Sequence, residues 1–143
     1  LCTGNSCRSQ IAAAYLEKLG GDRLAVYSAG TEPANDIHPL TRVVLAEDGI
    51  DIGDRTPADY RDYLGRISVY YLAIVCDGAA KSCPSVWPGV MERLLWPFED
   101  PAAFEGSHDE KLVRFRRVRD QIKDKVETWV SERETILRTP EVP

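Results

Sequence analysis

Apolar and polar positions alternate along the chain with two different periods. Between residues 111 and 132 the apolar side chains recur every three or four residues, whereas residues 69–75 form a nearly continuous apolar run. The first period is that of an amphipathic helix, and the second pattern is typical of a buried parallel strand. The predicted helices cover residues 9–19, 39–48, 59–64 and 111–132. The predicted strands cover residues 24–28, 69–75 and 92–95. Short strands alternating with helices predict an α/β domain with a parallel sheet.

Two of the predicted helices carry apolar stripes that we expect to pack on the sheet. The stripe of the last helix comprises Leu112, Phe115, Val118, Ile122, Val126 and Trp129. The stripe of the second helix comprises Leu40, Val43, Val44 and Ala46. Packing accounts for both stripes, so neither requires a further function.

Length and composition are those of one soluble globular domain. The chain has 143 residues, of which 43% are hydrophobic and 29% charged. We expect a single domain over residues 1–135 and a loose C-terminal tail over residues 136–143. The net charge is −5, and the positive cluster Arg114-Phe115-Arg116-Arg117 has the spacing of a solvated helix face, so no nucleic-acid partner is expected. No apolar stretch approaches the roughly 18 residues of a membrane helix, and no signal peptide is recognisable.

The strongest chemical signal is the segment from Cys2 to Ser9, Cys-Thr-Gly-Asn-Ser-Cys-Arg-Ser. In this segment a cysteine is followed by five residues, an arginine and a hydroxyl residue. This order is typical of a loop that surrounds a tetrahedral oxyanion next to a cysteine thiolate, and we call the segment the anion loop. Arg8 supplies a planar fork of donors, and Gly4 is expected to turn the backbone so that its N–H groups point inward. The following helix would direct its N-terminus at the anion. The alternative is an ordinary glycine turn with a buried cysteine.

The other residues of this loop have expected supporting roles. Asn5 would brace the backbone, and Ser9 would donate its hydroxyl to the Cys2 thiolate, although both could be a turn residue and a helix cap. Cys7 is expected to point away from the anion as a packing residue, with a reversible Cys2–Cys7 bridge as the less favoured alternative. The expected oxyanion-binding residues are Thr3, Gly4, Asn5, Ser6, Cys7, Arg8 and Ser9.

Asp100, which precedes Pro101, is the candidate general acid. A thiolate that displaces an oxygen from a tetrahedral centre needs an acid to protonate the departing oxygen, and proline would stiffen the loop that carries it. The alternative is a helix N-cap or a turn, which is a common role of an Asp-Pro pair.

Two further cysteines, Cys76 and Cys83, predict a dithiol relay. Cys76 falls at the carboxyl end of a predicted strand, where a parallel sheet binds its ligands, and Cys83 lies along a glycine-containing segment that we expect to be a movable loop. Alternatives are two buried inert thiols, structural disulfides in an oxidising compartment, or a zinc site, for which His38 and His108 are too remote. We favour reactive thiols in a cytoplasmic protein without a metal. Both histidines are expected at the surface.

The position of the anion loop also predicts a strand before it. Ligands of a parallel sheet lie at the carboxyl ends of the strands, so a strand should end just before Cys2. In this sequence that strand is reduced to Leu1 or absent, and we expect a longer native chain.

Five segments together resemble the thioredoxin-coupled arsenate reductases, which share the fold of the low-molecular-weight protein tyrosine phosphatases. They are the N-terminal motif, Ser28-Ala29-Gly30-Thr31, the pair Cys76 and Cys83-Pro84, the run from Trp96 to Pro101, and the run from Phe115 to Ile122. The resemblance spans residues 1 to about 130 and implies a three-layer sandwich around a four-stranded parallel sheet. The loop motif alone fits phosphatases too, and the second cysteine pair separates the two activities.

The resemblance implies reduction of arsenate to arsenite for arsenic detoxification, with phosphate or sulfate as substrate mimics. Cys2 would attack arsenate held by the loop amides and Arg8, while Asp100 protonates the leaving hydroxide. Cys76 would then attack Cys2 and release arsenite, and Cys83 would attack Cys76 and free Cys2. Thioredoxin or a similar dithiol would reduce the remaining bridge.

Two departures from the family pattern bear on the alternatives. Ala13 stands where many relatives have a glutamate that belongs to a potassium site, so no metal or cofactor is expected. Ala102 stands where phosphatases usually have a tyrosine, which weakens an aryl-phosphate substrate. A low-molecular-weight tyrosine phosphatase acting through a Cys2 phosphoenzyme stays an alternative, and so does a non-catalytic oxyanion-binding or redox-sensing module. Residual phosphatase activity is expected in either enzyme, because both use the same loop.

Overall fold

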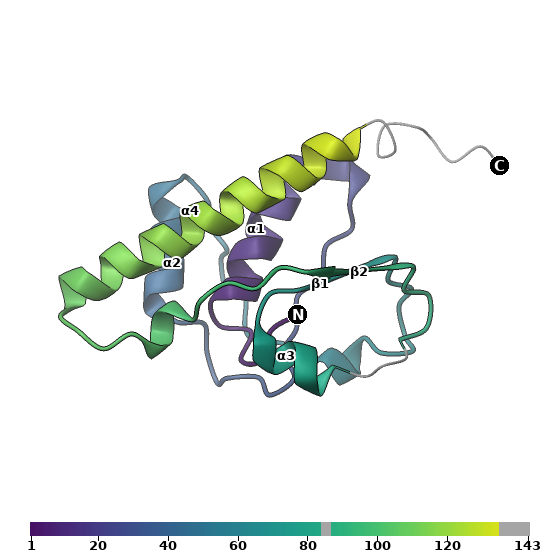
Figure 1. Cartoon of the computed structure of the whole chain (residues 1–143), viewed down its shortest axis with the longest axis horizontal. Helices are drawn as coiled ribbons and strands as arrows, with labels where there is room; N and C mark the ends of the chain where they lie inside the picture. The colour runs from purple at the N-terminus through teal and green to yellow at the C-terminus, as the bar shows by residue number, and fades with distance from the viewer. Residues whose placement is uncertain (84–86, 135–143) are drawn as a thin grey trace.

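Helices pack around a small parallel sheet (Figure 1). The structure is a computed structural model that describes residues 1–83 and 87–134. Its α-helices are α1 (Arg8–Gly20), α2 (Pro39–Glu47), α3 (Asp77–Ser82) and α4 (His108–Glu132). Its strands are β1 (Tyr71–Ile74) and β2 (Glu92–Leu95), and its short 3-10 helices are η1 (Gly21–Arg23), η2 (Tyr60–Asp62) and η3 (Pro101–Ala103). The predicted α/β class is confirmed, whereas the predicted tail, residues 136–143, lies outside the described residues.

In the described part of the chain, the sheet consists of β1 and β2. The strands run parallel, with Tyr71 opposite Glu92. The predicted four-stranded sheet is therefore not confirmed in these residues. The start of the chain continues the parallel pattern beside β1, because Leu1 donates to the Ala73 carbonyl at 2.7 Å and accepts from the Val75 N–H at 3.0 Å. Leu1 therefore lies where the last residue of a strand before the anion loop would lie.

Residues 24–28 are irregular, and the prediction of a strand there is wrong. They border a cavity of about 870 Å³, which Leu1 and parts of α1 and β1 also line. A strand requires a neighbour that exchanges backbone hydrogen bonds with it, and this segment faces the cavity instead. Pairing begins just after it, where the Cys2 N–H donates to the Ala29 carbonyl at 3.2 Å and Gly30 bridges to Cys2 and Asp59.

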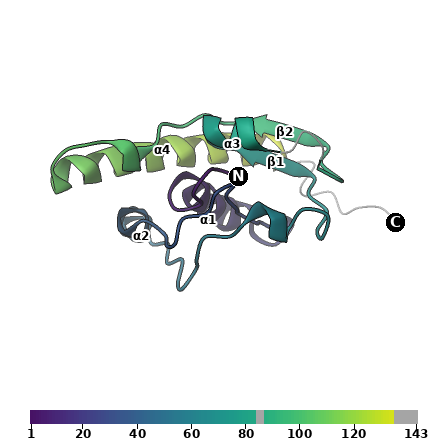
Figure 2. The same ribbon diagram turned by 90° about the horizontal axis from the view of Figure 1, so that it is seen from below.

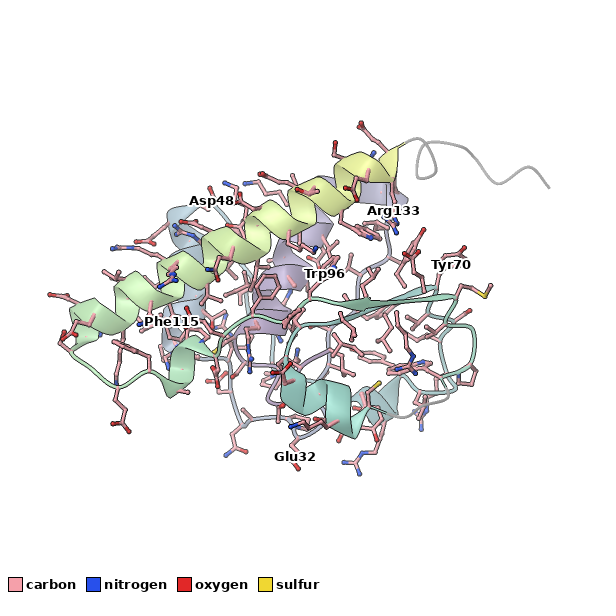
Figure 3. The ribbon with its side chains drawn as sticks, viewed as in Figure 1. Glu32, Asp48, Tyr70, Trp96, Phe115 and Arg133 are labelled. Carbon is pink, nitrogen blue, oxygen red and sulfur yellow. The ribbon has the colours of Figure 1, made fainter. Side chains whose placement is uncertain are left out.

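Helix α4 spans the molecule and packs on α1 and α2 (Figures 1 and 2), and its Trp129 ring meets Tyr71 of β1 with 5.0 Å between the ring centroids. It begins at His108, before the predicted start at residue 111, because Ser107 and Glu110 form a capping box. The predicted apolar stripe is buried from Phe115 to Trp129. Phe115 and Trp96 lie in the interior between this helix and the rest of the domain (Figure 3).

Helix α2 buries a different face from the predicted one. Val43 and Ala46 are exposed, so the prediction that they pack on the sheet is wrong. Thr41 and Leu45 are buried in their place, beside Leu40 and Val44. The Thr41 hydroxyl donates to the Ser6 carbonyl at 2.8 Å, and this bond to the anion loop accounts for the rotation of the buried face. The polar residue therefore marks the contact of α2 with the candidate site.

Two arginines of the basic cluster, Arg114 and Arg116, and the nearby Arg119 form ion pairs with other segments. Arg116 donates to both carboxylate oxygens of Glu47 on α2, and Arg119 reaches the same carboxylate at 2.9 Å. Arg114 pairs with Glu99 at 3.0 Å. These contacts give the cluster a structural role at the α2–α4 interface.

Within the described residues, none of the helices is both long and apolar enough to span a membrane.

Candidate active site

The anion loop encloses the Cys2 thiol with hydrogen-bond donors. Cys2 is 3% exposed, and its sulfur accepts from the Asn5 N–H at 3.1 Å. The Ser9 hydroxyl lies 2.8 Å from the same sulfur, as predicted. The sulfur of Cys2 therefore lies at the bottom of a loop with two hydrogen-bonding partners, the Asn5 N–H and the Ser9 hydroxyl, within contact distance.

Asn5, not Gly4, makes the sharp turn of the loop. Asn5 has a φ of 52°, in the left-handed region that asparagine tolerates better than most residues, whereas Gly4 is outside the positive-φ positions. The predicted bracing role of Asn5 agrees with its contacts. Its amide donates to the Ser9 hydroxyl at 2.7 Å, and its side-chain oxygen accepts from the Ala58 N–H at 2.8 Å and from Gln10 at 3.0 Å.

The carbonyl groups of the loop point outward toward the segment that follows residue 30. The carbonyls of Cys2, Thr3, Gly4 and Ser6 accept from the N–H groups of Thr31, Glu32, Ala34 and His38, respectively. Because the N–H and C=O of a peptide unit point in opposite directions, this pairing leaves loop N–H groups directed inward. Gly30 makes the close approach possible, since a Cβ there would lie 2.4 Å from the Thr3 carbonyl oxygen.

Arg8 and Asp100 meet at the mouth of the loop. Arg8 donates to the Phe98 carbonyl at 3.0 Å, and its guanidinium lies 3.8 Å from an Asp100 carboxylate oxygen. The other Asp100 oxygen accepts from the Ala102 N–H at 3.0 Å, so Asp100 also caps η3. The cap interpretation is therefore confirmed, and the cap fixes the carboxylate where the arginine of the loop can reach it, whereas the general-acid role stays a prediction.

Cys76 lies beside the anion loop, at the start of α3. Its sulfur accepts from the Ala79 N–H at 3.3 Å and lies 3.5 Å from the Thr3 hydroxyl. A Cβ at Gly78 would lie 2.6 Å from that hydroxyl oxygen, so glycine allows the helix to approach the loop. The loop thus contacts a second buried thiol directly, through the residue that follows Cys2.

Residues 77–82 form helix α3, and the prediction of a loop between Cys76 and Cys83 is wrong. Cys76 caps the N-terminus of this helix through its sulfur, and Cys83 caps its C-terminus through a backbone N–H that donates to the Ala79 carbonyl at 2.8 Å. Cys83 is half-buried, and its sulfur accepts from Arg93 on β2 at 3.5 Å. The structure therefore places Cys76 against Thr3, the residue that follows Cys2, and places Cys83 at the opposite end of α3.

Cys7 and His38 support the loop from outside. Burial raises the pKa of the Cys7 thiol, as expected of a protonated packing residue.

His38 is half-buried, so its predicted surface position is wrong. Its Nδ1 accepts from the Leu40 N–H at 3.1 Å and caps α2, while burial lowers its pKa. Its ring packs on Phe115, 4.7 Å between centroids.

All four thiols are free, and a metal site has no support in the described residues. Cys2, Cys7, Cys76 and Cys83 form no disulfide with one another. The described histidine, cysteine and acidic residues do not gather in a group of three that would hold an ion.

Sequence reasoning missed the contacts that link the loop to its surroundings. Thr3 was expected only as one of the oxyanion-binding residues, and neither Gly30 nor Arg93 had an expected role in the site. A glycine in Ser-Ala-Gly-Thr is a signal for close backbone approach. The contacts of Thr3 with Cys76 and of Arg93 with Cys83 could not be predicted from the sequence around these residues. Each contact joins two segments that only the folded chain brings together.

An α/β fold that holds a cysteine in an oxyanion loop defines a class of thiol-containing anion-binding proteins. The chain belongs to the family described as low molecular weight phosphotyrosine protein phosphatase, which matches residues 1–139. It is 43% identical over 129 residues to an arsenate reductase from Halalkalibacterium halodurans, across 90% of this chain and 91% of the relative. It is 40% identical to an arsenate reductase from Bacillus subtilis, with the same shares covered.

Solved structures give the same family. A structure described as an arsenate reductase in the phosphate binding state has a TM-score of 0.73 and 30% identity, covering 92% of this chain and 93% of that one. A thioredoxin-dependent arsenate reductase from Corynebacterium glutamicum has a TM-score of 0.69 and 31% identity, covering 94% of this chain and 60% of that one. The predicted family and fold are thereby confirmed.

Proposed function

We propose that this protein is a cytoplasmic arsenate reductase that moves two electrons from its thiols to bound arsenate. The observation that carries the proposal is the contact between the anion loop and a second thiol. The Thr3 hydroxyl lies 3.5 Å from the Cys76 sulfur. A phosphatase needs one thiol at its loop, whereas a reductase needs a second thiol within reach of the first.

The first step is attack of the Cys2 thiolate on arsenic. The loop amides and Arg8 bind the arsenate oxygens, and phosphate, being of the same shape and charge, should bind in their place. A bond forms between the Cys2 sulfur and arsenic while one As–O bond breaks. Asp100 gives its proton to the departing oxygen, which leaves as water. The 3.8 Å approach of Arg8 to Asp100 supports this assignment, because both groups then face one ligand.

The second step forms the first disulfide and completes the reduction. The Cys76 thiolate attacks the Cys2 sulfur, and the electron pair of the S–As bond remains on arsenic, which leaves as arsenite. Thr3 and the Ala79 N–H stabilise the attacking thiolate through the contacts at 3.5 Å and 3.3 Å. One disulfide supplies the two electrons that separate As(V) from As(III).

The third step moves the disulfide to the surface. The Cys83 thiolate attacks the Cys76 sulfur, and Cys2 leaves as a thiolate. The six residues of α3 separate the two cysteines, so their Cα atoms lie about 10 Å apart along the helix axis. A disulfide requires about 4.4–6.8 Å, and α3 must therefore unwind when the bond forms.

A dithiol donor then reduces the Cys76–Cys83 bridge and completes the cycle. Thioredoxin is the donor we propose, because a relative of the same fold is described as thioredoxin-dependent. Exposure of the bridge on an unwound α3 would give a protein reductant access. Such a cycle requires a compartment that keeps thiols reduced, which is why we place the protein in the cytoplasm.

The proposal is tested by following NADPH oxidation with arsenate, thioredoxin and thioredoxin reductase. The native protein should turn over steadily, whereas its Cys83→Ser form should stop after a single cycle with a Cys2–Cys76 disulfide. Hydrolysis of an aryl phosphate without any arsenate-dependent oxidation would favour the phosphatase. Saturable binding of arsenate with neither activity would favour a binding or sensing module.

A weak phosphatase activity is a second expectation for the same site. Cys2, Arg8 and Asp100 supply a nucleophile, an anion clamp and an acid, which suffice for phosphate ester hydrolysis. Cys76→Ser should leave this hydrolysis in place while abolishing arsenate reduction, as measured with an aryl phosphate and with the coupled assay.

A further inference from the structure

We propose that Arg93 stabilises the Cys83 thiolate and so sets the rate at which the disulfide leaves the anion loop. The inference rests on the proposed thiol relay, in which Cys83 is the last nucleophile. It assigns to β2 a role in the reaction beyond its place in the sheet. The contact that carries it is the Arg93 guanidinium donating to the Cys83 sulfur at 3.5 Å.

The contact joins two consecutive elements, α3 and β2, across ten positions of the sequence. Arg93 stands on β2, in register with Leu72 of β1, and Cys83 is the residue that ends α3. Arg93 is exposed and Cys83 is half-buried, so their contact lies near the surface of the protein. Holding a long arginine side chain in one position costs conformational freedom, and a charge-assisted contact with sulfur contributes to offsetting that cost.

The electrostatics of α3 explain why Cys83 needs a cation and Cys76 does not. Cys76 caps the N-terminus of the helix and accepts the Ala79 N–H at 3.3 Å, so backbone donors already stabilise its negative charge. Cys83 lies at the opposite end, where the last carbonyl groups carry partial negative charge. A thiolate there is disfavoured unless a positive group faces it.

Arg93 is distinguished from the other charged groups nearby by its direct contact. The charged side chains of the two elements are Asp77 and Lys81 on α3 and Glu92 and Arg93 on β2. Glu92 pairs with Arg133 on the α4 side of the sheet, and strand alternation directs Arg93 to the opposite face. Lys81 carries the same charge and is close in sequence to Cys83, which makes it a matched control.

The step that Arg93 assists is balanced within the protein. Cys83 loses a proton to solvent, and its thiolate attacks the Cys76 sulfur of the Cys2–Cys76 disulfide. The S–S bond between Cys76 and Cys83 forms as the bond to Cys2 breaks, and Cys2 leaves with the electron pair. No external oxidant or reductant is consumed. A greater fraction of Cys83 as thiolate speeds this exchange, although by less than the increase in that fraction, because a thiolate of lower pKa is a weaker nucleophile.

The test measures the alkylation rate of Cys83 by iodoacetamide in the fully reduced, folded protein, between pH 6 and 10. Mass spectrometry of the Cys83 peptide separates it from the three other thiols. At neutral pH, Cys83 of Arg93→Gln should be alkylated about twofold to fivefold more slowly than Cys83 of the native protein, which is the range for an exposed charged pair. The rates should converge at high pH, where Cys83 is thiolate in both. Arg93→Lys should restore most of the rate, and Lys81→Gln should change it less than Arg93→Gln.

Equal rates in Arg93→Gln and the native protein, or an equal loss in Lys81→Gln, would overturn the inference. A loss that persists unchanged at high pH would also overturn it, because that result reports altered access to Cys83 rather than altered charge. Alkylation needs no arsenate, so this outcome is independent of whether the protein reduces arsenate. Conversely, an intact arsenate cycle with unchanged alkylation would leave the proposed function standing and remove the role of Arg93.

Discussion

At the scale of single residues, the site depends on side chains that tie one loop to three neighbouring segments. Asn5 stabilises the turn through hydrogen bonds with Ser9 and Ala58. Gly30 leaves room for the Thr3 carbonyl of the loop. The Thr3 hydroxyl contacts the Cys76 sulfur. The motif predicted Asn5 and Ser9 in their observed roles, because those contacts are local. It assigned the turn to Gly4, since glycine is the usual residue at positive φ, but the hydrogen bonds of Asn5 stabilise that conformation instead.

Replacing Thr3 by valine should slow reduction more than hydrolysis. Valine keeps the shape of the side chain but removes the hydroxyl that lies 3.5 Å from the Cys76 sulfur. We expect formation of the Cys2–Cys76 disulfide to slow by about threefold to tenfold, which corresponds to about 0.7–1.4 kcal/mol, within the range for one ordinary hydrogen bond. The ratio of arsenate reduction to aryl phosphate hydrolysis is the measurement. Thr3→Ser, which retains the hydroxyl, should keep the native ratio, and an equal loss in both variants would refute the contact.

Cys7 should make the folded protein less stable at high pH. Burial raises the pKa of this thiol in the folded state, so the unfolded chain releases its proton first. The contribution to stability is complete below the unfolded pKa of about 8.5 and declines as the pH rises above it. Urea unfolding at pH 7.5 and 9.5, with a reductant present, should show a smaller loss in Cys7→Ala than in the native protein. Identical losses would show that Cys7 does not couple folding to pH.

At the scale of elements, the periodic pattern predicted α4 well, because this helix buries a face that its own sequence defines, and α1 and β2 also lie close to their predicted positions. The errors fall where tertiary contacts decide. Residues 24–28 have the composition of a strand but face a cavity of about 870 Å³. The sequence of residues 77–82 favours a loop, because its side chains are mostly small and it includes a glycine. These residues nevertheless form α3, which Cys76 caps. In α2, the bond from Thr41 to Ser6 overrides the apolar stripe.

The cap of α2 should make stability depend on pH in the acidic range. His38 accepts the Leu40 N–H through Nδ1, which requires the neutral ring, and burial lowers its pKa below 6.5. The unfolded state therefore binds the proton first, and stability falls as the pH drops below about 6.5. His38→Asn should flatten the dependence between pH 7 and 5.5 because asparagine caps without titrating, and His38→Ala should lose about 1 kcal/mol at pH 7. Chemical denaturation at several pH values measures both, and a parallel decline in His38→Asn would exclude the cap as the cause.

At the scale of the whole molecule, the packed helices α1, α2 and α4 support one short helix, α3, which we expect to open. Helix α4 packs on α1 and α2, and Glu47 joins α2 to α4 through two arginines, so the anion loop is held by extensive contacts. Helix α3 has six residues and joins two thiols, and short helices open at low free-energy cost. The proposed route of the disulfide follows this division, from the buried loop to the element that opens most readily.

The central claim is that three thiols pass one disulfide outward while arsenate is reduced. The most direct measurement adds excess arsenate to the reduced protein without any external reductant, then quantifies arsenite and maps the disulfides by mass spectrometry. The account predicts one arsenite per chain, a Cys76–Cys83 disulfide and a free Cys2 thiol. Fully reduced cysteines and no arsenite, in protein that still hydrolyses an aryl phosphate, would contradict it.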